Sequence, residues 1–190
     1  MSTEPASRLI LASASPQRRA ILKRLGVSFT VAPADIREIS QGDPAEVALQ
    51  NALSKAQAVH RPGADEIVLG VDTLVTIGGR IYGKPADEDG ARSVLRVLAG
   101  ATHTVLSGMA LLIEGQQRTA LSETRVSFRG LSERLLDWYL ATGEWRERAG
   151  GYAIQGAGAA LVRSIDGDYE NVVGLPLSCL LDIYPDLLGT

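Results

Sequence analysis

Residues 67–73 constrain the fold more than any other stretch of the chain. This run of apolar, largely β-branched residues is typical of a buried strand, and it ends in the polar pair Asp72 and Thr73. Because open α/β sheets bind ligands at the carboxyl ends of their strands, the pattern predicts a functional carboxylate at a strand end. A turn or helix cap is the alternative interpretation, since Asp is common at both places.

Strand and helix patterns alternate on both sides of this stretch. Strands are predicted over residues 8–12, 28–32, 74–77, 80–82, 103–113, 119–128 and 160–165. Helices are predicted over residues 16–25, 45–60, 91–98, 134–141 and 177–184. Interleaved strands and helices with a long antiparallel pair indicate an α/β fold with a mixed sheet. The sequence holds no linker or repeat, so residues 1–190 are expected to form a single domain.

A candidate anion-binding loop lies between the first predicted strand and the first predicted helix. Ser13 and Ser15 precede Pro16, and proline after serine is a common start signal for a helix. Gln17 and Arg18 follow in the first turn. Free backbone N–H groups at a helix N-terminus favour an anion, so this loop is either a phosphate site or a capped helix with exposed arginines.

Two lysines extend this pattern. Lys55 lies late in the second predicted helix, and Lys84 follows a glycine hairpin at residues 78–79. An acid, a hydroxyl and two lysines are what a phosphate and its metal ion need. A lysine on a helix is more often a solvated surface charge, and that alternative stays open for Lys55.

The stretch 142–158 is rich in glycine and contains Gln155. Glycines permit tight turns or close backbone approach to a ligand. A glutamine amide offers a paired donor and acceptor that can read a base edge. The alternative is a flexible surface loop, which is the commoner explanation of clustered glycines.

Composition narrows the possible partners. The formal net charge of −3 gives no general attraction to nucleic acid or anionic lipid, and 5% aromatic residues are too few for a base-stacking platform. With one cysteine and two histidines, any metal is expected to be a hard cation on oxygen ligands. The chain shows no signal-peptide pattern and no run of transmembrane length, so we expect a cytoplasmic protein.

Six motifs in register resemble those of the Maf family of nucleotide pyrophosphatases, over residues 9–180. They are LASASPQRR at 11–19, LGVDT at 69–73, GKP at 83–85, LAGATH at 98–103, AGGYAIQG at 149–156 and VVGLP at 172–176. The resemblance implies an elongated mixed sheet flanked by helices, with a deep cleft, as in inosine triphosphate pyrophosphatases. It also implies hydrolysis of a nucleoside triphosphate between the α- and β-phosphates, with Mg²⁺ or Mn²⁺ as cofactor. A homodimer is possible.

The resemblance carries roles over to matched positions. Asp72 falls on the family's catalytic aspartate, which is described as the proton acceptor. Three residues fall on the phosphate-binding loop, namely Ser13, Ser15 and Arg18. Three more fall on polar positions of the cleft, namely Glu38, Lys55 and Lys84. We expect Glu38 and Asp72 to hold the metal ion, and Asp72 to bind or orient the attacking water.

Three positions bear on the choice of base. Thr73 and Gln155 match the branch that prefers dTTP and UTP, whereas the branch that prefers 7-methyl-GTP typically has Gln and Glu there. Gln17 departs from both branches, which usually have Arg or Trp at that position. Arg37 also departs, because an acid commonly precedes Glu38, unless Asp35 substitutes.

Hydrolysis of dTTP and UTP is therefore the function that the sequence favours. The alternatives are a 7-methyl-GTP pyrophosphatase, a nucleotidyltransferase that passes the nucleotide to an acceptor, and a non-catalytic nucleotide-binding regulator of cell division.

Overall fold

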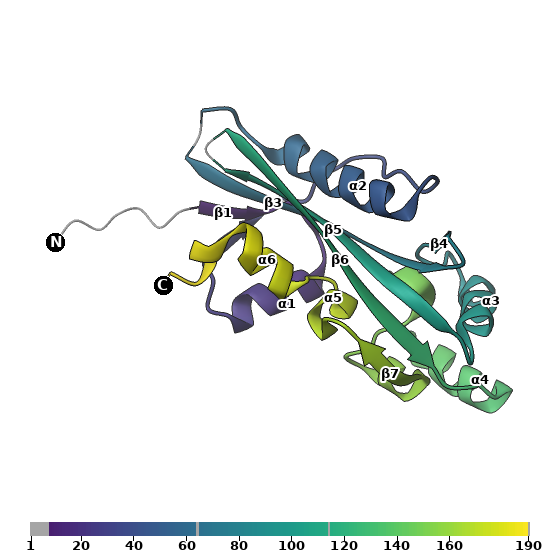
Figure 1. Cartoon of the computed structure of the whole chain (residues 1–190). Coiled ribbons are helices and arrows are strands. Elements are labelled where there is room, and N and C mark those ends of the chain that lie inside the picture. The colour runs from purple at the N-terminus through teal and green to yellow at the C-terminus, as the bar shows by residue number, and fades with distance from the viewer. Residues whose placement is uncertain (1–7, 64, 114, 190) are drawn as a thin grey trace.

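A computed structural model describes residues 8–63, 65–113 and 115–189 (Figure 1). The strands form one sheet in the order β2-β1-β3-β5-β6-β7, with β4 paired to β3. Their bounds are β1 (Arg8–Leu11), β2 (Phe29–Val31), β3 (Glu66–Ile77), β4 (Arg80–Tyr82), β5 (Thr102–Ile113), β6 (Gln116–Phe128) and β7 (Val162–Asp166). β1 runs parallel to β2 and β3, and the other pairs are antiparallel, which confirms the predicted mixed sheet.

Helices cover both faces of this sheet. The α-helices are α1 (Pro16–Arg24), α2 (Pro44–Val59), α3 (Glu88–Leu98), α4 (Glu133–Ala141), α5 (Tyr169–Val173) and α6 (Leu177–Ile183). The 3₁₀-helices are η1 (Ala149–Gly151), η2 (Ala157–Leu161) and η3 (Pro185–Leu188). α2 lies over one face of β3 and β5, whereas α1 and α6 lie on the opposite face (Figure 1). The flanking helices of the prediction are thus present.

The prediction that a strand ends at Asp72 and Thr73 is wrong. β3 continues to Ile77 because β5 pairs with it without interruption, from Val68 to Thr76. The strand that ends nearby is the parallel neighbour β1, whose last residue, Leu11, pairs with Leu69. On that edge β4 begins to pair only at Val75, so residues 70–74 of β3 have a neighbouring strand on one side alone. β3 is therefore open along this edge over residues 70–74.

Alternation along β3 divides its residues between two helical layers. Val68 packs under α2, whereas Leu69 and Val71 pack against α1 and α6. Asp72 therefore points to the α2 face and Thr73 to the α1 face. Further along, Val75 belongs to a separate hydrophobic cluster that includes α3 and α4. Thr73 thus lies between these two large clusters, whereas Asp72 lies on the other face, under α2.

Small residues bring α2 unusually close to the sheet. A Cβ atom on Gly70 would collide with the backbone of α2 at Ala52, and one on Gly108 would collide with it at Ala48. Gly108 is also the cross-strand partner of Asp72. Because the helix backbone rests on these glycines, side chains of α2 reach the carboxylate of Asp72.

The glycine-rich stretch 142–158 packs rather than forming a flexible loop. It forms η1 and the start of η2, and Tyr152 and Ile154 are buried in the core with α3 and α4. Gly150 and Gly151 adopt positive φ angles of 68° and 69° and lie close to Val75 and Pro85. The short helix α5 is a feature that the sequence patterns did not predict.

Candidate active site

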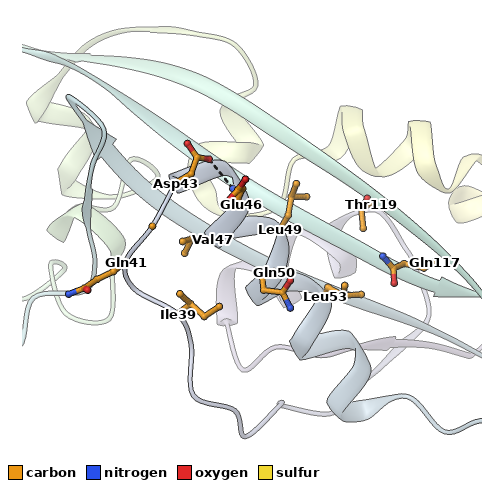
Figure 2. A pocket seen from close by; sticks show the side chains of 11 residues that line it. Ile39, Gln41, Asp43, Glu46, Val47, Leu49, Gln50, Leu53, Gln117 and Thr119 are labelled. Carbon is orange, nitrogen blue, oxygen red and sulfur yellow. Dashed lines mark hydrogen bonds between the residues drawn. The ribbon is translucent and has the colours of Figure 1, made fainter.

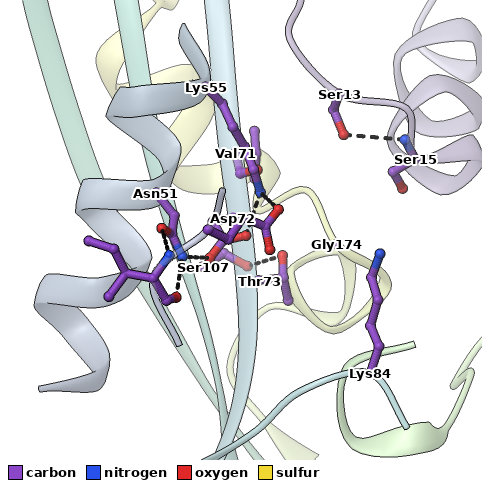
Figure 3. Close-up of polar contacts among 12 residues, drawn as sticks. Ser13, Ser15, Asn51, Lys55, Val71, Asp72, Thr73, Lys84, Ser107 and Gly174 are labelled. Carbon is purple, nitrogen blue, oxygen red and sulfur yellow. Dashed lines mark hydrogen bonds and ion pairs between the residues drawn. The ribbon is translucent and has the colours of Figure 1, made fainter. Parts of the chain in front are cut away.

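A cleft of about 530 Å³ opens at the free edge of β3. The loop from β1 into α1 forms one wall, and the segments around Lys84 and Arg148 form another. Most predicted site residues line it, namely Ser13, Ser15, Gln17, Arg18, Glu38, Lys55, Asp72, Thr73 and Lys84. Gln155 does not line this cleft and is exposed to solvent. The structure thus gathers residues that lie far apart in the sequence (Figure 3).

Lys55 lies between two carboxylates. Its Nζ atom is 2.6 Å from Asp72 Oδ1 and 2.7 Å from Glu38 Oε1, and it also donates to the carbonyl of Val71 at 3.4 Å. The side chains of Lys55 and Asp72 are only 10% and 6% exposed, whereas Glu38 is 52% exposed. Lys55 is therefore a buried cation of the site and not a solvated surface charge.

Asn51 completes the surroundings of Asp72. Its Nδ2 atom donates to Asp72 Oδ2 at 2.9 Å, so both carboxylate oxygens of Asp72 have protein partners (Figure 3). Sequence analysis missed Asn51. The available signal was its spacing: a residue four positions before Lys55 on a helix lies on the same face.

Arg18 is a buried cation whose described partners are all neutral. Its guanidinium donates to Gly174 O at 2.8 Å, Ser13 Oγ at 2.8 Å and Thr73 Oγ1 at 3.1 Å. Burial lowers the pKa of the Arg18 guanidinium, and the charges of Asp72 and Glu38 act in the opposite direction. A buried guanidinium without a carboxylate partner in the described residues suits a phosphate group, which accepts charge-assisted hydrogen bonds from Arg.

Thr73 contacts Arg18 on the α1 face of the sheet. The Thr73 hydroxyl accepts a hydrogen bond from Arg18. It shares a second hydrogen bond, of 2.9 Å, with Ser107 Oγ, which Figure 3 shows. The Thr73 hydroxyl thus has two partners within the protein, Arg18 and Ser107. Thr73 thus holds Arg18 by a hydrogen bond and also lines the cleft, and its contact with a base stays a prediction.

The loop into α1 is organised around its serines. Ser15 caps α1 by accepting from the Arg18 N–H at 3.4 Å, and its hydroxyl donates to Gln17 Oε1 at 3.2 Å. Ser13 Oγ accepts from both Ser15 N and Arg18. Gln17 is half-buried in the cleft wall, where it can contact a ligand.

Lys84 marks the rim of the cleft. It forms an ion pair of 3.0 Å with Glu147, and the two side chains are 59% and 81% exposed. Glu147 has a φ of 58°, which makes it the single non-glycine residue with positive φ in the described ranges. The left-handed backbone there costs free energy, and such conformations gather at functional sites.

A divalent cation fits the acidic residues of the cleft when substrate phosphates are added. The described residues contain no cluster of three or more His, Cys, Asp or Glu side chains that could hold a metal by themselves. Glu38 and Asp72 converge on the same lysine, so their oxygens lie close together. Mg²⁺ is usually held by one or two carboxylates together with phosphates and water, which matches this pair.

Buried cations beside two carboxylates, at the open edge of a mixed α/β sheet, define an anion-binding site of the kind that phosphate-transferring and phosphate-hydrolysing proteins use. The chain belongs to the Maf family: the family described as Maf-like protein matches residues 8–186.

Curated relatives share much of the sequence. The dTTP/UTP pyrophosphatase of Gloeobacter violaceus is 47% identical, covering 93% of this chain and 94% of its own. The dTTP/UTP pyrophosphatase of Pyrococcus furiosus is 42% identical, covering 93% of each chain. Among solved structures, the Staphylococcus aureus Ham1 protein aligns over 64% of this chain and 71% of its own, with a TM-score of 0.43 and 12% identity. In the described ranges, none of the helices has the length and apolar character needed to cross a membrane.

Proposed function

We propose that this chain hydrolyses dTTP and UTP to the nucleoside monophosphate and pyrophosphate. The observation that carries the proposal is the buried Asp72 carboxylate held beside Lys55, in the same cleft as the Arg18 guanidinium, which has no carboxylate partner among the described residues. The choice of substrates is supported by the two dTTP/UTP pyrophosphatases that are 42% and 47% identical to this chain over nearly its whole length.

The cations of the cleft would bind the triphosphate. Arg18 and the N-terminus of α1 offer hydrogen-bond donors at one wall, and Lys84 offers a charge at the rim. The formal net charge of the protein is −3, so this local cluster has to overcome the general repulsion of an anionic substrate. Binding in this way would leave the α-phosphate near the carboxylates.

Asp72 would orient the attacking water. Lys55 and Asn51 each bind one of its oxygens, so the carboxylate has little freedom to turn. Glu38 and Asp72 would hold a Mg²⁺ or Mn²⁺ ion, which would offset phosphate charge and activate water. Water would attack the α-phosphorus and give a proton to the Asp72 carboxylate, while the bond to the bridging oxygen breaks and pyrophosphate leaves with the electron pair.

The choice of base remains a prediction that rests on the relatives. Gln155 lies outside the cleft, so its proposed contact with a pyrimidine is tested only by substitution. Gln17, which lines the cleft, is the better placed of the two amides. If Gln155→Ala leaves the ratio of UTP to CTP turnover unaltered, the role of Gln155 is excluded.

The deciding experiment measures pyrophosphate release from dTTP, UTP, CTP, GTP and 7-methyl-GTP, with Mg²⁺ or Mn²⁺ and without an acceptor. Turnover led by dTTP and UTP is the expected result. Turnover led by 7-methyl-GTP would keep the chemistry and overturn the base preference. Release only after an acceptor is added would indicate a nucleotidyltransferase, and binding without turnover would indicate a regulator. A cytoplasmic location and a homodimer belong to the same proposal.

A further inference from the structure

Asn51 contacts the Asp72 carboxylate directly, and it also contacts the backbone of Ile39, the residue that follows Glu38. It lies on α2 and is 2% exposed. Its Nδ2 atom donates to Asp72 Oδ2 at 2.9 Å and to the carbonyl of Ile39 at 2.9 Å. Its Oδ1 atom accepts from the N–H of Ile39 at 2.8 Å. Both amide protons and the amide oxygen are therefore used.

The orientation of this amide is fixed by its neighbours. The N–H of Ile39 can only donate, and a carboxylate can only accept. Turning the amide over would set its oxygen against Asp72 and its NH₂ group against an N–H. The side chain of Asn51 is thus held in one arrangement, in which the same NH₂ group serves Asp72 and the loop.

The loop that Asn51 holds has no helix or strand of its own. Residues 32–43 run between β2 and α2, and Glu38 comes immediately before the clamped residue Ile39. Glu38 lines the cleft, whereas Ile39 lines a separate groove of about 520 Å³ with Leu49 and Leu53 (Figure 2). The peptide bond between Glu38 and Ile39 therefore lies between the cleft and the groove. Asn51 holds it through its hydrogen bonds to the backbone of Ile39.

We propose that Asn51 is a positioning residue that sets the Glu38 carboxylate relative to the Asp72 carboxylate. It does so by holding the Asp72 side chain directly and the Glu38 segment through the backbone of Ile39. The proposal rests on the proposed function, because the two acids matter together only if they share a cation and a reacting water. An apolar residue at position 51 would leave three polar groups without these partners.

A leucine substitution with a matched control tests this role. Asn51→Leu removes every hydrogen bond of the amide. The control Gln50→Leu replaces the amide of the preceding residue, which is exposed and donates only to Ser54 at 3.4 Å among the described residues. We expect Asn51→Leu to lower kcat for dTTP by about 10- to 100-fold, the usual effect of losing a residue that orients metal ligands. Gln50→Leu should match the parent protein.

Two binding measurements separate positioning from general damage. Mn²⁺ affinity, followed by the electron paramagnetic resonance signal of free Mn²⁺ in the presence of a non-hydrolysable dTTP analogue, should fall about 10-fold or more in Asn51→Leu. Binding of the same analogue without any cation should stay within about twofold, because Arg18 and Lys84 do not touch Asn51. A lower melting temperature with unchanged kcat and Mn²⁺ affinity would reduce Asn51 to a structural tie and overturn the proposal.

A double-mutant cycle tests the route through Glu38. If Asn51 acts partly by placing Glu38, then Asn51→Leu together with Glu38→Gln should cost less than the product of the two single losses. Losses that multiply fully would exclude that route.

Should the leucine variant not fold, Asn51→Asp serves instead: it keeps the size and the acceptor for Ile39 and loses the donors. A parent protein without activity on dTTP or UTP would sink the proposed function, whereas an active parent with equally active variants would sink only this inference.

Discussion

Two of the lysine–carboxylate pairs in the cleft, Lys55 with Asp72 and Lys84 with Glu147, differ in burial and in the elements that carry them. Lys55 and Asp72 are 10% and 6% exposed, and both extend from regular elements that pack tightly against each other. Lys84 and Glu147 are 59% and 81% exposed, and both lie outside helices and strands. The distances are similar, at 2.6 Å and 3.0 Å. Distance alone therefore says little about what an ion pair contributes, because burial decides how strongly water and salt weaken it.

The largest expected effect comes from removing the charge of the buried carboxylate. Asp72→Asn should lower kcat by about 10²- to 10⁴-fold, since a positioned group that handles a proton contributes about that much. The amide keeps the shape of the side chain, so circular dichroism should match that of the parent. Pyrophosphate release measures the loss. A variant that retains most of its activity would remove Asp72 from the mechanism.

The buried cation should matter for stability as well as for activity. Lys55→Met leaves Asp72 without the ammonium group, and removing one partner of a buried pair costs about 3–5 kcal/mol. Urea denaturation measures the change. The double variant Lys55→Met with Asp72→Asn should recover much of the stability and none of the activity, because the buried charge of Asp72 is removed together with its partner. The Glu38 carboxylate also loses Lys55, but it is 52% exposed and water can solvate it. Equal stability of the two variants would contradict a strong buried pair.

His103, a buried ionisable residue outside the cleft, shows separately how burial of a titratable group affects stability. His103 is 1% exposed and bonds Tyr152 Oη through Nε2 at 2.9 Å, while its Nδ1 atom has no partner among the described residues. Burial lowers the pKa of His103 from 6.5 to about 4. Between these values the unfolded chain binds a proton that the folded protein does not bind.

Stability should therefore fall as the pH drops from about 7 to about 4. At about 1.4 kcal/mol for each pKa unit, the contribution of His103 amounts to about 3 kcal/mol by pH 4. Urea denaturation of the parent and of His103→Phe at several pH values measures the difference. The phenylalanine variant should lose stability less steeply on acidification. Parallel pH curves for the two proteins would show that His103 does not titrate in this way.

The smallest effects are expected at the rim. Lys84→Met should change the free energy of unfolding by less than about 1 kcal/mol, because exposed ion pairs contribute little. KM for dTTP should rise by about tenfold at most at low salt, and the difference from the parent should shrink in 0.5 M NaCl, where the Debye length is only about 3–5 Å.

Glu147→Gly provides the matched control for that rim pair. Glycine adopts positive φ at little cost, so the loop keeps its conformation while the carboxylate disappears. Releasing Lys84 should lower KM slightly or leave it unchanged. A large loss of activity in this variant would give Glu147 a role that the ion pair does not explain.

The residue types of the candidate site could be predicted from the sequence, but their arrangement could not. The order of Ser13, Ser15 and Arg18 around a helix start points to an anion site, and the structure places these side chains together in the cleft. The ending of a strand at Asp72 was predicted wrongly, because the apolar run says nothing about which neighbouring strand stops. Asn51 was not predicted, because its spacing of four residues from Lys55 shows only that the two share a helix face and not that this face meets Asp72.

The sequence by itself determined the alternation of strands and helices, the capped start of α1 and the supply of cations in a chain of net negative charge. These follow from local periodicity and from side-chain chemistry, which a linear pattern records. Only the tertiary structure decided that Lys55 is buried between two acids, that Thr73 serves Arg18, and that Gln155 lies outside the cleft. The physical reason is contact between distant segments. α2 rests on Gly70 and Gly108, and that close approach brings Asn51 and Lys55 to Asp72.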